Sequence, residues 1–227
     1  MSSALRAVLF DLDGTLLDTA PDFATVVNRL LGEEGRAPQP YASLRAAVSH
    51  GSRALIERAF GIDPGHADFA RLRARLLELY AANLLVDTVP FAGIPQLLAT
   101  LAERELHWGV VTNKPVWLAE PLLGLARLEP PHRVLICPEH VTNTKPDPEP
   151  LLLACARLGC SPAEAVYIGD HYRDIEAGRR AGMPTIAAGW GYLEPGESAV
   201  DWAADHTADT VDEARGILFA HYLAHRP

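Results

Sequence analysis

The sequence predicts an α/β fold, a doubly wound parallel β-sheet core with an inserted α-helical cap domain. Beyond residue 88, short apolar runs alternate with segments of helical periodicity, which is typical of a parallel sheet covered by helices. Between residues 20 and 86 no strand-like run occurs, and apolar residues recur at helical spacing. We therefore expect a discontinuous core of residues 1–17 and 88–227 and a helical cap of residues 18–87.

Five short apolar runs bounded by polar or glycine-containing loops are the expected strands. They are residues 7–10, 108–111, 134–136, 166–168 and 185–187, and the expected core helices are 94–103, 116–125, 149–158 and 175–181. Ser161 as N-cap, Pro162 and Glu164 predict a helical turn before the fourth strand. In the cap, helical spacing covers residues 23–31, 44–48, 54–60 and 69–84, and the polar stretches 18–22 and 86–90 are the expected hinges.

Composition and charge restrict the class of partner. The chain has 227 residues, of which 48% are hydrophobic and 22% charged, as in ordinary globular proteins. Its net charge of −9 argues against nucleic acid and favours a small ligand. Asp11 interrupts the first apolar run and no run is long enough to span a membrane, so we expect neither a secretory signal nor a membrane protein. Three unpaired-looking cysteines fit a reducing, cytoplasmic location. The sequence does not indicate the oligomeric state.

Polar side chains follow several of the expected strands. Asp11 and Asp13 follow the first, Thr112-Asn113-Lys114 the second, and Asp170 to Asp174 the fourth, while Lys145 precedes the third core helix. In a doubly wound sheet the carboxyl ends of the strands form the ligand site, so we expect these groups to meet there.

The acid pair Asp11 and Asp13 requires a reason for its mutual repulsion. In extended backbone, residues two apart point to the same side, so both carboxylates would face one small volume. A lone Asp is most often a loop residue or a helix cap. The joint pattern instead favours a divalent cation held by Asp11 and Asp170, and oxygen-only ligands suit Mg²⁺.

The lysines add to this pattern. Of the 20 lysine and arginine residues, just two are lysines, and both Lys114 and Lys145 fall in these loops. An ammonium group is a compact charge that can lie between a phosphate and a carboxylate. Lys114 could equally be an exposed surface lysine or a residue of the site.

Four motifs together resemble those of the haloacid dehalogenase-like phosphohydrolases. They are FDLDGT around Asp11, VVTNK around Thr112, TKPD around Lys145 and IGD followed by Asp174, in the family's order. The resemblance spans almost the whole chain and implies that family's Rossmann-like core with its helical cap. The sequence around VVTNKP, CPEHVTNTKPDPEP and AAGWGYLEP resembles most the phosphoglycolate phosphatase-like branch, including the N-acetylmuramic acid 6-phosphate phosphatases.

The resemblance implies a role for each core motif residue. Asp11 would be the nucleophile that forms an aspartyl phosphate, and Asp13 would protonate the leaving alcohol and then activate water. Thr112 and Lys145 would hold the phosphoryl oxygens together with backbone N–H groups of Leu12, Asp13 and Asn113. Mg²⁺ would bind Asp11, Asp170 and the backbone carbonyl of Asp13. Asp174 would lie outside the direct metal ligands or brace Lys145.

His171 departs from the motif, since many relatives carry a second Asp there. We expect it to lie outside the direct metal ligands, where a loop histidine is the simplest reading.

Substrate specificity must come from the cap and from loops that close over the site. The candidates are His50, Arg53 and Tyr192. Arg53 could pair a substrate carboxylate in a bidentate fork or be a surface residue early in a cap helix, and Tyr192 could flank the entrance or pack in the core. The resemblance implies hydrolysis of a small carboxylate-bearing phosphomonoester, 2-phosphoglycolate or N-acetylmuramic acid 6-phosphate.

The same motifs bear on several other functions. A sugar-phosphate mutase shares every core motif and stays an alternative. Another small-metabolite phosphatase of the family is also an alternative, for the same reason. A dehalogenase would lack a second acid at Asp13. A non-catalytic phospholigand-binding protein would have lost Asp11, Asp13 or Asp170, and all three are present.

Overall fold

The computed structural model describes residues 4–223, so residues 1–3 and 224–227 of the predicted core lie outside the described part. Within it, six strands form one parallel sheet. Their order is β5 (Val134–Ile136), β4 (His107–Val111), β1 (Ala7–Phe10), β6 (Ala165–Gly169), β7 (Thr185–Ala188) and β8 (His206–Ala208). This confirms the predicted fold class.

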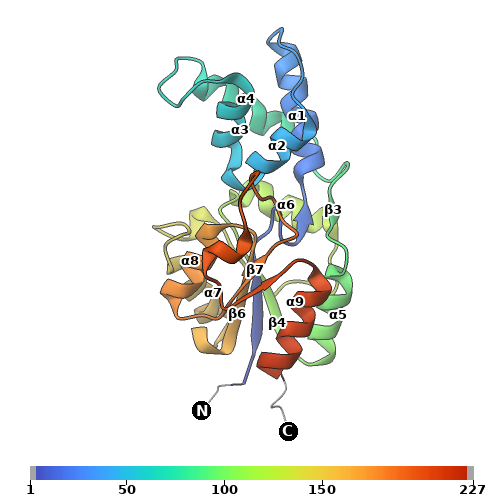
Figure 1. The fold of residues 1–227 in the computed structure, drawn as a ribbon, viewed down its shortest axis with the longest axis vertical. Coiled ribbons are helices and arrows are strands. Elements are labelled where there is room, and N and C mark those ends of the chain that lie inside the picture. The colour runs from blue at the N-terminus through green and yellow to red at the C-terminus, as the bar shows by residue number, and fades with distance from the viewer. Residues whose placement is uncertain (1–3, 224–227) are drawn as a thin grey trace.

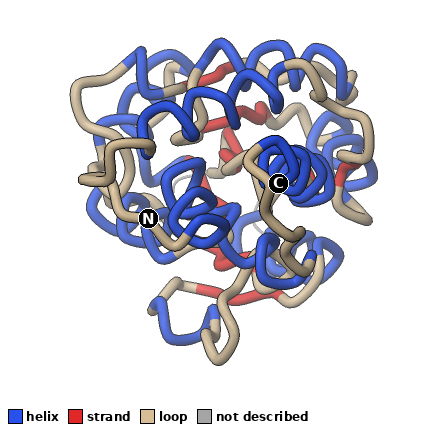
Figure 2. Tube along the Cα trace, turned by 90° about the horizontal axis from the view of Figure 1, so that it is seen from above, coloured by secondary structure: helices blue, strands red, loops and turns tan. Residues whose placement is uncertain are grey.

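The central strand β1 is fully buried because helices cover both of its faces. Val8 and Phe10 belong to the cluster that includes residues of α5 (Ile94–Glu103), α6 (Val116–Ala126) and α9 (Val211–Ile217). Ala7 and Leu9 point the other way, toward α7 (Glu149–Leu158) and α8 (Tyr172–Ala181). Seen from the end of the molecule that carries the cap helices, helices lie on both sides of the line of strands (Figure 2).

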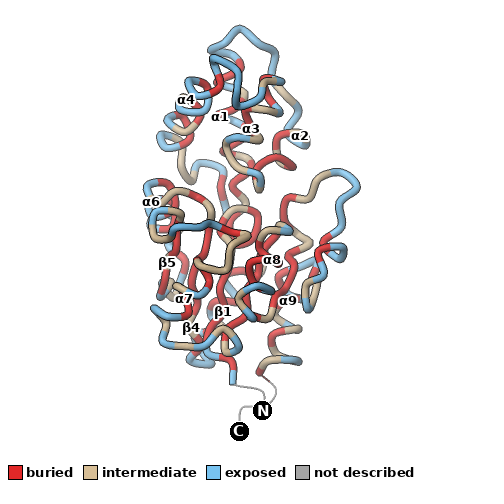
Figure 3. The backbone as a smooth tube through the Cα atoms, turned by 90° about the vertical axis from the view of Figure 1, so that its left-hand side faces the viewer, coloured by how far each residue is buried: buried red, intermediate tan, exposed pale blue. Residues whose placement is uncertain are grey.

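Four helices lie over the carboxyl edge of the sheet (Figure 1). They are α1 (Ala20–Glu33), α2 (Tyr41–Ala47), α3 (Gly51–Phe60) and α4 (Phe69–Ala81). Their inward side chains form a hydrophobic cluster of their own, to which the core contributes Leu118 and Tyr192. Figure 3 shows this upper layer with buried segments facing inward and exposed segments outward. The exact division into a core of 1–17 and 88–227 and a cap of 18–87 stays a prediction.

The two chain segments that connect the layers are paired with each other. Strands β2 (Leu17–Asp18) and β3 (Val89–Pro90) form a short antiparallel ladder. Next to it, the buried carboxylate of Asp22 accepts hydrogen bonds from the backbone N–H groups of Val86, Asp87 and Thr88 at 3.1, 2.8 and 3.2 Å. The hydroxyl of Thr88 donates a fourth, at 2.6 Å. The stretches predicted as hinges are therefore tied together at one place.

Most predicted elements are present, with differences at their ends. Helix α8 begins at Tyr172 instead of residue 175, because the His171 side chain accepts a hydrogen bond from the Arg173 N–H and caps it. Ser161 and Glu164 form the expected capping box. The sequence analysis missed β8, α9 and the π-helical segment Leu218–Leu223 that follows it. No helix within residues 4–223 is long and apolar enough to cross a membrane.

Replacing Asp22 should destabilise the fold. Asp22→Ala leaves the buried N–H and hydroxyl of Thr88 without an acceptor, and we expect a loss of about 2–4 kcal/mol in the free energy of unfolding. Urea titration followed by circular dichroism measures it. Asp87→Ala, which removes an exposed carboxylate on the same segment, is the control and should change the free energy by less than about 0.5 kcal/mol. Equal effects for both variants would contradict the role given to Asp22.

Candidate active site

Lys145 lies buried at the carboxyl edge of the sheet, surrounded by oxygen atoms. Its Nζ is 3.1 Å from Asp11 Oδ2 and 2.6 Å from Asp174 Oδ1, and its side chain is 1% exposed. The carbonyl of Val111 and the hydroxyl oxygen of Tyr167 accept further hydrogen bonds at 3.0 and 2.7 Å. Burial alone would lower the pKa of Lys145, but the two carboxylates raise it above its ordinary value. The ammonium group is therefore held charged beside Asp11.

Three carboxylates gather next to this ammonium. Oxygen atoms of Asp11, Asp170 and Asp174 lie within 4.8 Å of one another, close enough to share one metal ion. Burial, and then the charges of Asp11 and Asp174, raise the pKa of Asp170 to about 7. Asp174 was expected outside the direct ligands, and its carboxylate indeed binds Lys145 and the His171 N–H, but it also belongs to this cluster.

Asp13 points away from that cluster. Its carboxylate pairs with Lys114 Nζ at 2.9 and 3.2 Å and accepts a hydrogen bond of 2.6 Å from the Thr19 hydroxyl. Lys114 is buried and also donates to the hydroxyl of Tyr80, on cap helix α4, at 3.0 Å. Lys114 is thus not an exposed surface lysine, and it connects the cap to Asp13.

The groups expected to cradle a phosphate lie around Asp11. Thr112 and Asn113 line the same cavity as Asp11, and the Asn113 side chain pairs with the backbone of Lys145 at 3.0 and 3.2 Å. The Leu12 N–H donates to the carboxylate of Asp11 itself at 2.7 Å. The structure therefore brings these residues together, while their contacts with a phosphate stay predictions.

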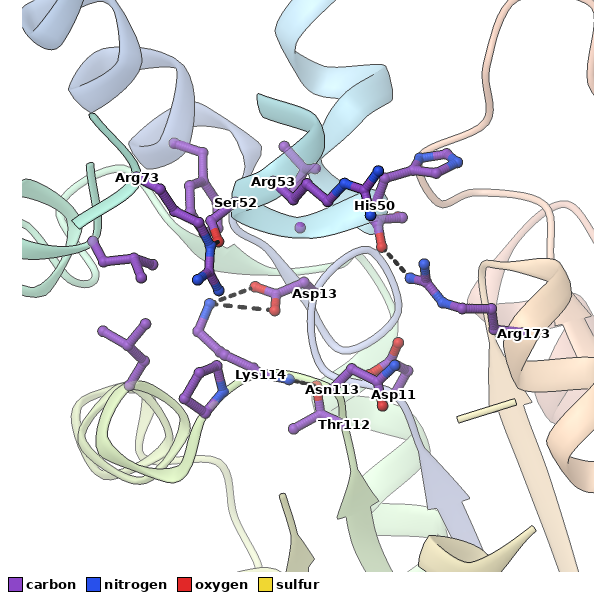
Figure 4. A pocket seen from close by; sticks show the side chains of 17 residues that line it. Asp11, Asp13, His50, Ser52, Arg53, Arg73, Thr112, Asn113, Lys114 and Arg173 are labelled. Carbon is purple, nitrogen blue, oxygen red and sulfur yellow. Dashed lines mark hydrogen bonds and ion pairs between the residues drawn. The ribbon is translucent and has the colours of Figure 1, made fainter. Parts of the chain in front are cut away.

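A cavity of about 240 Å³ lies between the sheet edge and the cap (Figure 4). Its core wall includes Asp11, Asp13, Thr112, Asn113 and Lys114. The cap wall has a polar part from residues 49–53 and Arg73, and an apolar part that includes Phe23, Val48 and Leu77. His50 and Arg53 therefore line the cavity from the cap, while their part in substrate specificity stays a prediction.

The cap segment Val48–His50, called the cap loop below, also contacts the carboxylate cluster. The Ser49 hydroxyl donates to Asp170 Oδ2 at 2.7 Å, and the Ser49 carbonyl accepts a hydrogen bond from Arg173. The ring nitrogens Nε2 of His50 and His171 are 3.3 Å apart. Burial, then the charges of Arg173 and the His50 ring, lower the pKa of His171 to about 3, so its ring is neutral. His171 caps α8 and contacts the cap, and it is not in the carboxylate cluster.

Tyr192 is not at the cavity, so of the two positions expected for it the structure shows packing in the interior and not the entrance. Its side chain is 1% exposed, and its hydroxyl donates to Asp18 Oδ1 at 2.8 Å and accepts from the Ala20 N–H at 3.0 Å. Its backbone N–H donates to Asp170. Tyr192 thus packs where the chain enters the cap, because the loop after β7 folds back over Asp170.

Several residues of the site were missed by the sequence analysis. Arg73 and Arg173 line the cavity, and Tyr80 and Tyr167 bind the two lysines. Arg173 could have been found, because it lies in the loop and first helical turn that follow β6. The other three come from helix or strand interiors, where a pattern of apolar spacing does not separate site residues from packing residues.

Comparison with known proteins agrees with this geometry. The family model described as haloacid dehalogenase-like hydrolase matches residues 8–188. The chain is 45% identical over 214 residues to N-acetylmuramic acid 6-phosphate phosphatase of Pseudomonas aeruginosa, covering 94% of this chain and 95% of that protein. It is 43% identical over 203 residues to phosphoglycolate phosphatase of Xanthomonas campestris pv. campestris, covering 88% and 90%.

A solved structure shows the same fold. The crystal structure of a predicted phosphoglycolate phosphatase from Haemophilus somnus 129pt superimposes with a TM-score of 0.84 at 22% identity, covering 96% of this chain and 99% of that one. The family-model match and the two relatives carry the assignment beyond the fold. This protein therefore belongs to the haloacid dehalogenase-like hydrolases, and it is a phosphatase of that family.

Proposed function

We propose that this phosphatase hydrolyses a small carboxylate-bearing phosphomonoester with Mg²⁺ and through an aspartyl phosphate on Asp11. The observation that carries the proposal is the position of Asp11, which faces the cavity and touches the buried ammonium of Lys145. A carboxylate in that place is an available nucleophile, and the ammonium can neutralise the charge of an arriving phosphoryl group.

Each residue has a defined part in the two steps. A carboxylate oxygen of Asp11 attacks phosphorus, the bond from phosphorus to the substrate oxygen breaks, and Asp13 gives its proton to the leaving alcohol. Asp13 then takes a proton from water, which attacks phosphorus and releases inorganic phosphate and free Asp11. Lys145, Thr112 and Asn113 hold the phosphoryl oxygens. Lys114 and Thr19 fix the orientation of the Asp13 carboxylate.

The residues present fit a magnesium ion. The donors are carboxylate oxygens, and the three clustered acids Asp11, Asp170 and Asp174 share the one ammonium group of Lys145. A divalent cation balances the remaining charge. Asp11, Asp170 and the backbone carbonyl of Asp13 would hold it, and when bound it supplies electrostatic stabilisation of phosphoryl charge.

The side chain of Asp170 is fixed by backbone packed against it. A Cβ built on Gly14 would lie 2.0 Å from Asp170 Oδ2, and one on Gly191 would lie 2.1 Å from Asp170 Cβ. Thr15 donates to the other oxygen at 3.1 Å. The site thus reserves its space for one carboxylate in one orientation, as a rigid metal ligand needs.

The cavity supports a carboxylate-bearing substrate. Arginine side chains and apolar side chains share its cap wall, which suits an alcohol that has both an anionic group and apolar surface. Two relatives are named for substrates of this class, N-acetylmuramic acid 6-phosphate and phosphoglycolate. The apolar wall favours the larger of the two. The cytoplasmic location stays a prediction from the sequence.

A substrate panel tests the proposal. Phosphate release should be measured with Mg²⁺ for 2-phosphoglycolate, N-acetylmuramic acid 6-phosphate and p-nitrophenyl phosphate. EDTA should stop the reaction and added Mg²⁺ should restore it. Turnover that persists in EDTA, or no release of phosphate from either carboxylate-bearing substrate, would count against the proposal. A rearranged phosphate ester as the product would favour a mutase.

Asp11→Asn should abolish turnover, because an amide is a poor nucleophile and a poor metal ligand. We expect kcat to fall by at least about four orders of magnitude, equal to about 5.5 kcal/mol of lost transition-state stabilisation. Phosphate release with p-nitrophenyl phosphate measures the loss. Asn113→Asp, which introduces a carboxylate nearby, should not rescue it. Activity within tenfold of the wild type would rule out Asp11 as nucleophile.

Asp13→Asn should separate the two steps. With p-nitrophenyl phosphate the leaving phenolate needs no proton, so Asp11 should still be phosphorylated, whereas the water in the second step has lost its base. We expect a rapid burst of p-nitrophenol of about one equivalent, followed by slow turnover, in stopped-flow measurements. An alkyl phosphate should show neither phase. Steady turnover at the wild-type rate without a burst would refute the role of Asp13.

Gly14→Ala should weaken metal binding by crowding Asp170. Gly14 has φ +82 and no space for a Cβ, so we expect at least tenfold weaker Mn²⁺ binding measured directly by electron paramagnetic resonance. Gly35→Ala is the matched control, since Gly35 has φ +68 but nothing within 4 Å of the added Cβ. It shares the backbone strain and should bind Mn²⁺ as the wild type does. Equal affinity in the two variants would contradict the crowding.

A further inference from the structure

Three guanidinium groups line the cavity within the described residues, and they differ in what neutralises them. Arg53, on α3, donates from Nε to Glu57 one helical turn away at 2.9 Å, and its side chain is 66% exposed. Arg173, on α8, donates to the carbonyl of Ser49. Arg53 thus already has a carboxylate partner in its own helix.

Arg73, on α4, has a different environment. Its Nε donates to the hydroxyl of Ser52 at 2.9 Å. No carboxylate of residues 4–223 forms an ion pair with it, and its two Nη groups have no hydrogen-bond partner in that part of the chain. Ser52 therefore fixes one side of the guanidinium and leaves the edge formed by the two Nη groups available for two parallel hydrogen bonds.

Arg73 and Arg173 are the cavity arginines without an ion pair among residues 4–223, but one Nη group of Arg173 already donates to Ser49, whereas both Nη groups of Arg73 lack a partner there. Asp11 is paired with Lys145, and Asp13 with Lys114, so neither cavity carboxylate needs Arg73. Arg73 is exposed, as Arg53 is, so the two differ in their partners and not in their burial. Phe23 and Leu77 line the same cavity and give an apolar surface beside Arg73. Figure 4 shows Arg73 and Asp11 on opposite sides of Asp13 in that view.

We propose that Arg73, oriented by Ser52, is the residue that binds the carboxylate of the substrate, in place of Arg53. The inference rests on the proposed function, since it concerns the leaving group of that reaction. A flat edge with two donors matches the two oxygens of a carboxylate, whereas a second phosphate would call for donors in three dimensions. Arg73 is a specificity-determining residue and has no part in phosphoryl transfer.

The matched substrates for the test are N-acetylmuramic acid 6-phosphate and N-acetylglucosamine 6-phosphate. The second lacks the lactyl group and with it the carboxylate, but has the same phosphate and sugar ring. The measured quantity is the ratio of their kcat/KM values. A folding defect lowers both values by the same factor and leaves their ratio unchanged, so a change in the ratio reports carboxylate recognition.

Arg73→Ala should lower this ratio by about 10- to 100-fold, mainly through KM for the carboxylate-bearing substrate. Arg73→Lys should restore part of it, since one ammonium cannot reproduce a two-donor edge. Ser52→Ala should lower the ratio by a smaller factor, because the guanidinium loses its fixed orientation. Arg53→Ala should change it by less than about threefold.

Arg71→Ala is the matched control on the same helix. Arg71 pairs with Glu34 and Asp68 outside the cavity, and the ratio should stay at the wild-type value. If Arg73→Ala keeps the wild-type ratio, the assignment of Arg73 is wrong. If the ratio falls with Arg53→Ala instead, Arg53 is the carboxylate ligand. If the wild type hydrolyses no carboxylate-bearing substrate, the proposed function itself fails and the inference with it.

Discussion

The site depends on one buried positive charge. The ammonium of Lys145 lies between Asp11 and Asp174, at 3.1 and 2.6 Å, at the point where three parallel strands end. Without it, the carboxylates of Asp11, Asp170 and Asp174 would repel one another in a largely buried region. Lys145 lets acids gather at the sheet edge because its positive charge offsets part of their repulsion. The buried hydroxyl of Tyr167 and the carbonyl of Val111 complete the shell of the ammonium and fix its position.

The second layer of the molecule contributes to this chemistry directly. Tyr80 of α4 binds Lys114, which binds Asp13, and Ser49 of the cap loop reaches Asp170. The cap is therefore more than a cover over the cavity. Its position affects the orientation of two carboxylates, so in the proposed reaction leaving-group recognition and acid chemistry would depend on the same helices.

Much of this could be predicted because apolar runs and strand-end motifs are local signals. The carboxylates, Thr112 and Lys145 follow buried strands, and a doubly wound sheet brings such residues to one edge. The place of Tyr192 stayed open because no local pattern tells whether a tyrosine after a strand points into a cavity or under a loop. Strand β8 was missed because His206-Thr207-Ala208 is short and partly polar. Arg73 was missed because its spacing on α4 identifies an exposed helical position but does not tell whether that position faces the cavity or the solvent.

The ladder between β2 and β3 affects which parts of the protein can be exchanged during evolution. The chain leaves the core and returns to it at neighbouring points, Leu17 beside Pro90 and Asp18 beside Val89. The roughly seventy residues in between therefore leave and re-enter the core at neighbouring positions, as the residues of a short loop would. A different helical insertion could be exchanged there without altering strand order. It would, however, have to replace the contacts that Tyr80 makes with Lys114 and Ser49 makes with Asp170, so the base of the insertion is less free to change than its outer helices.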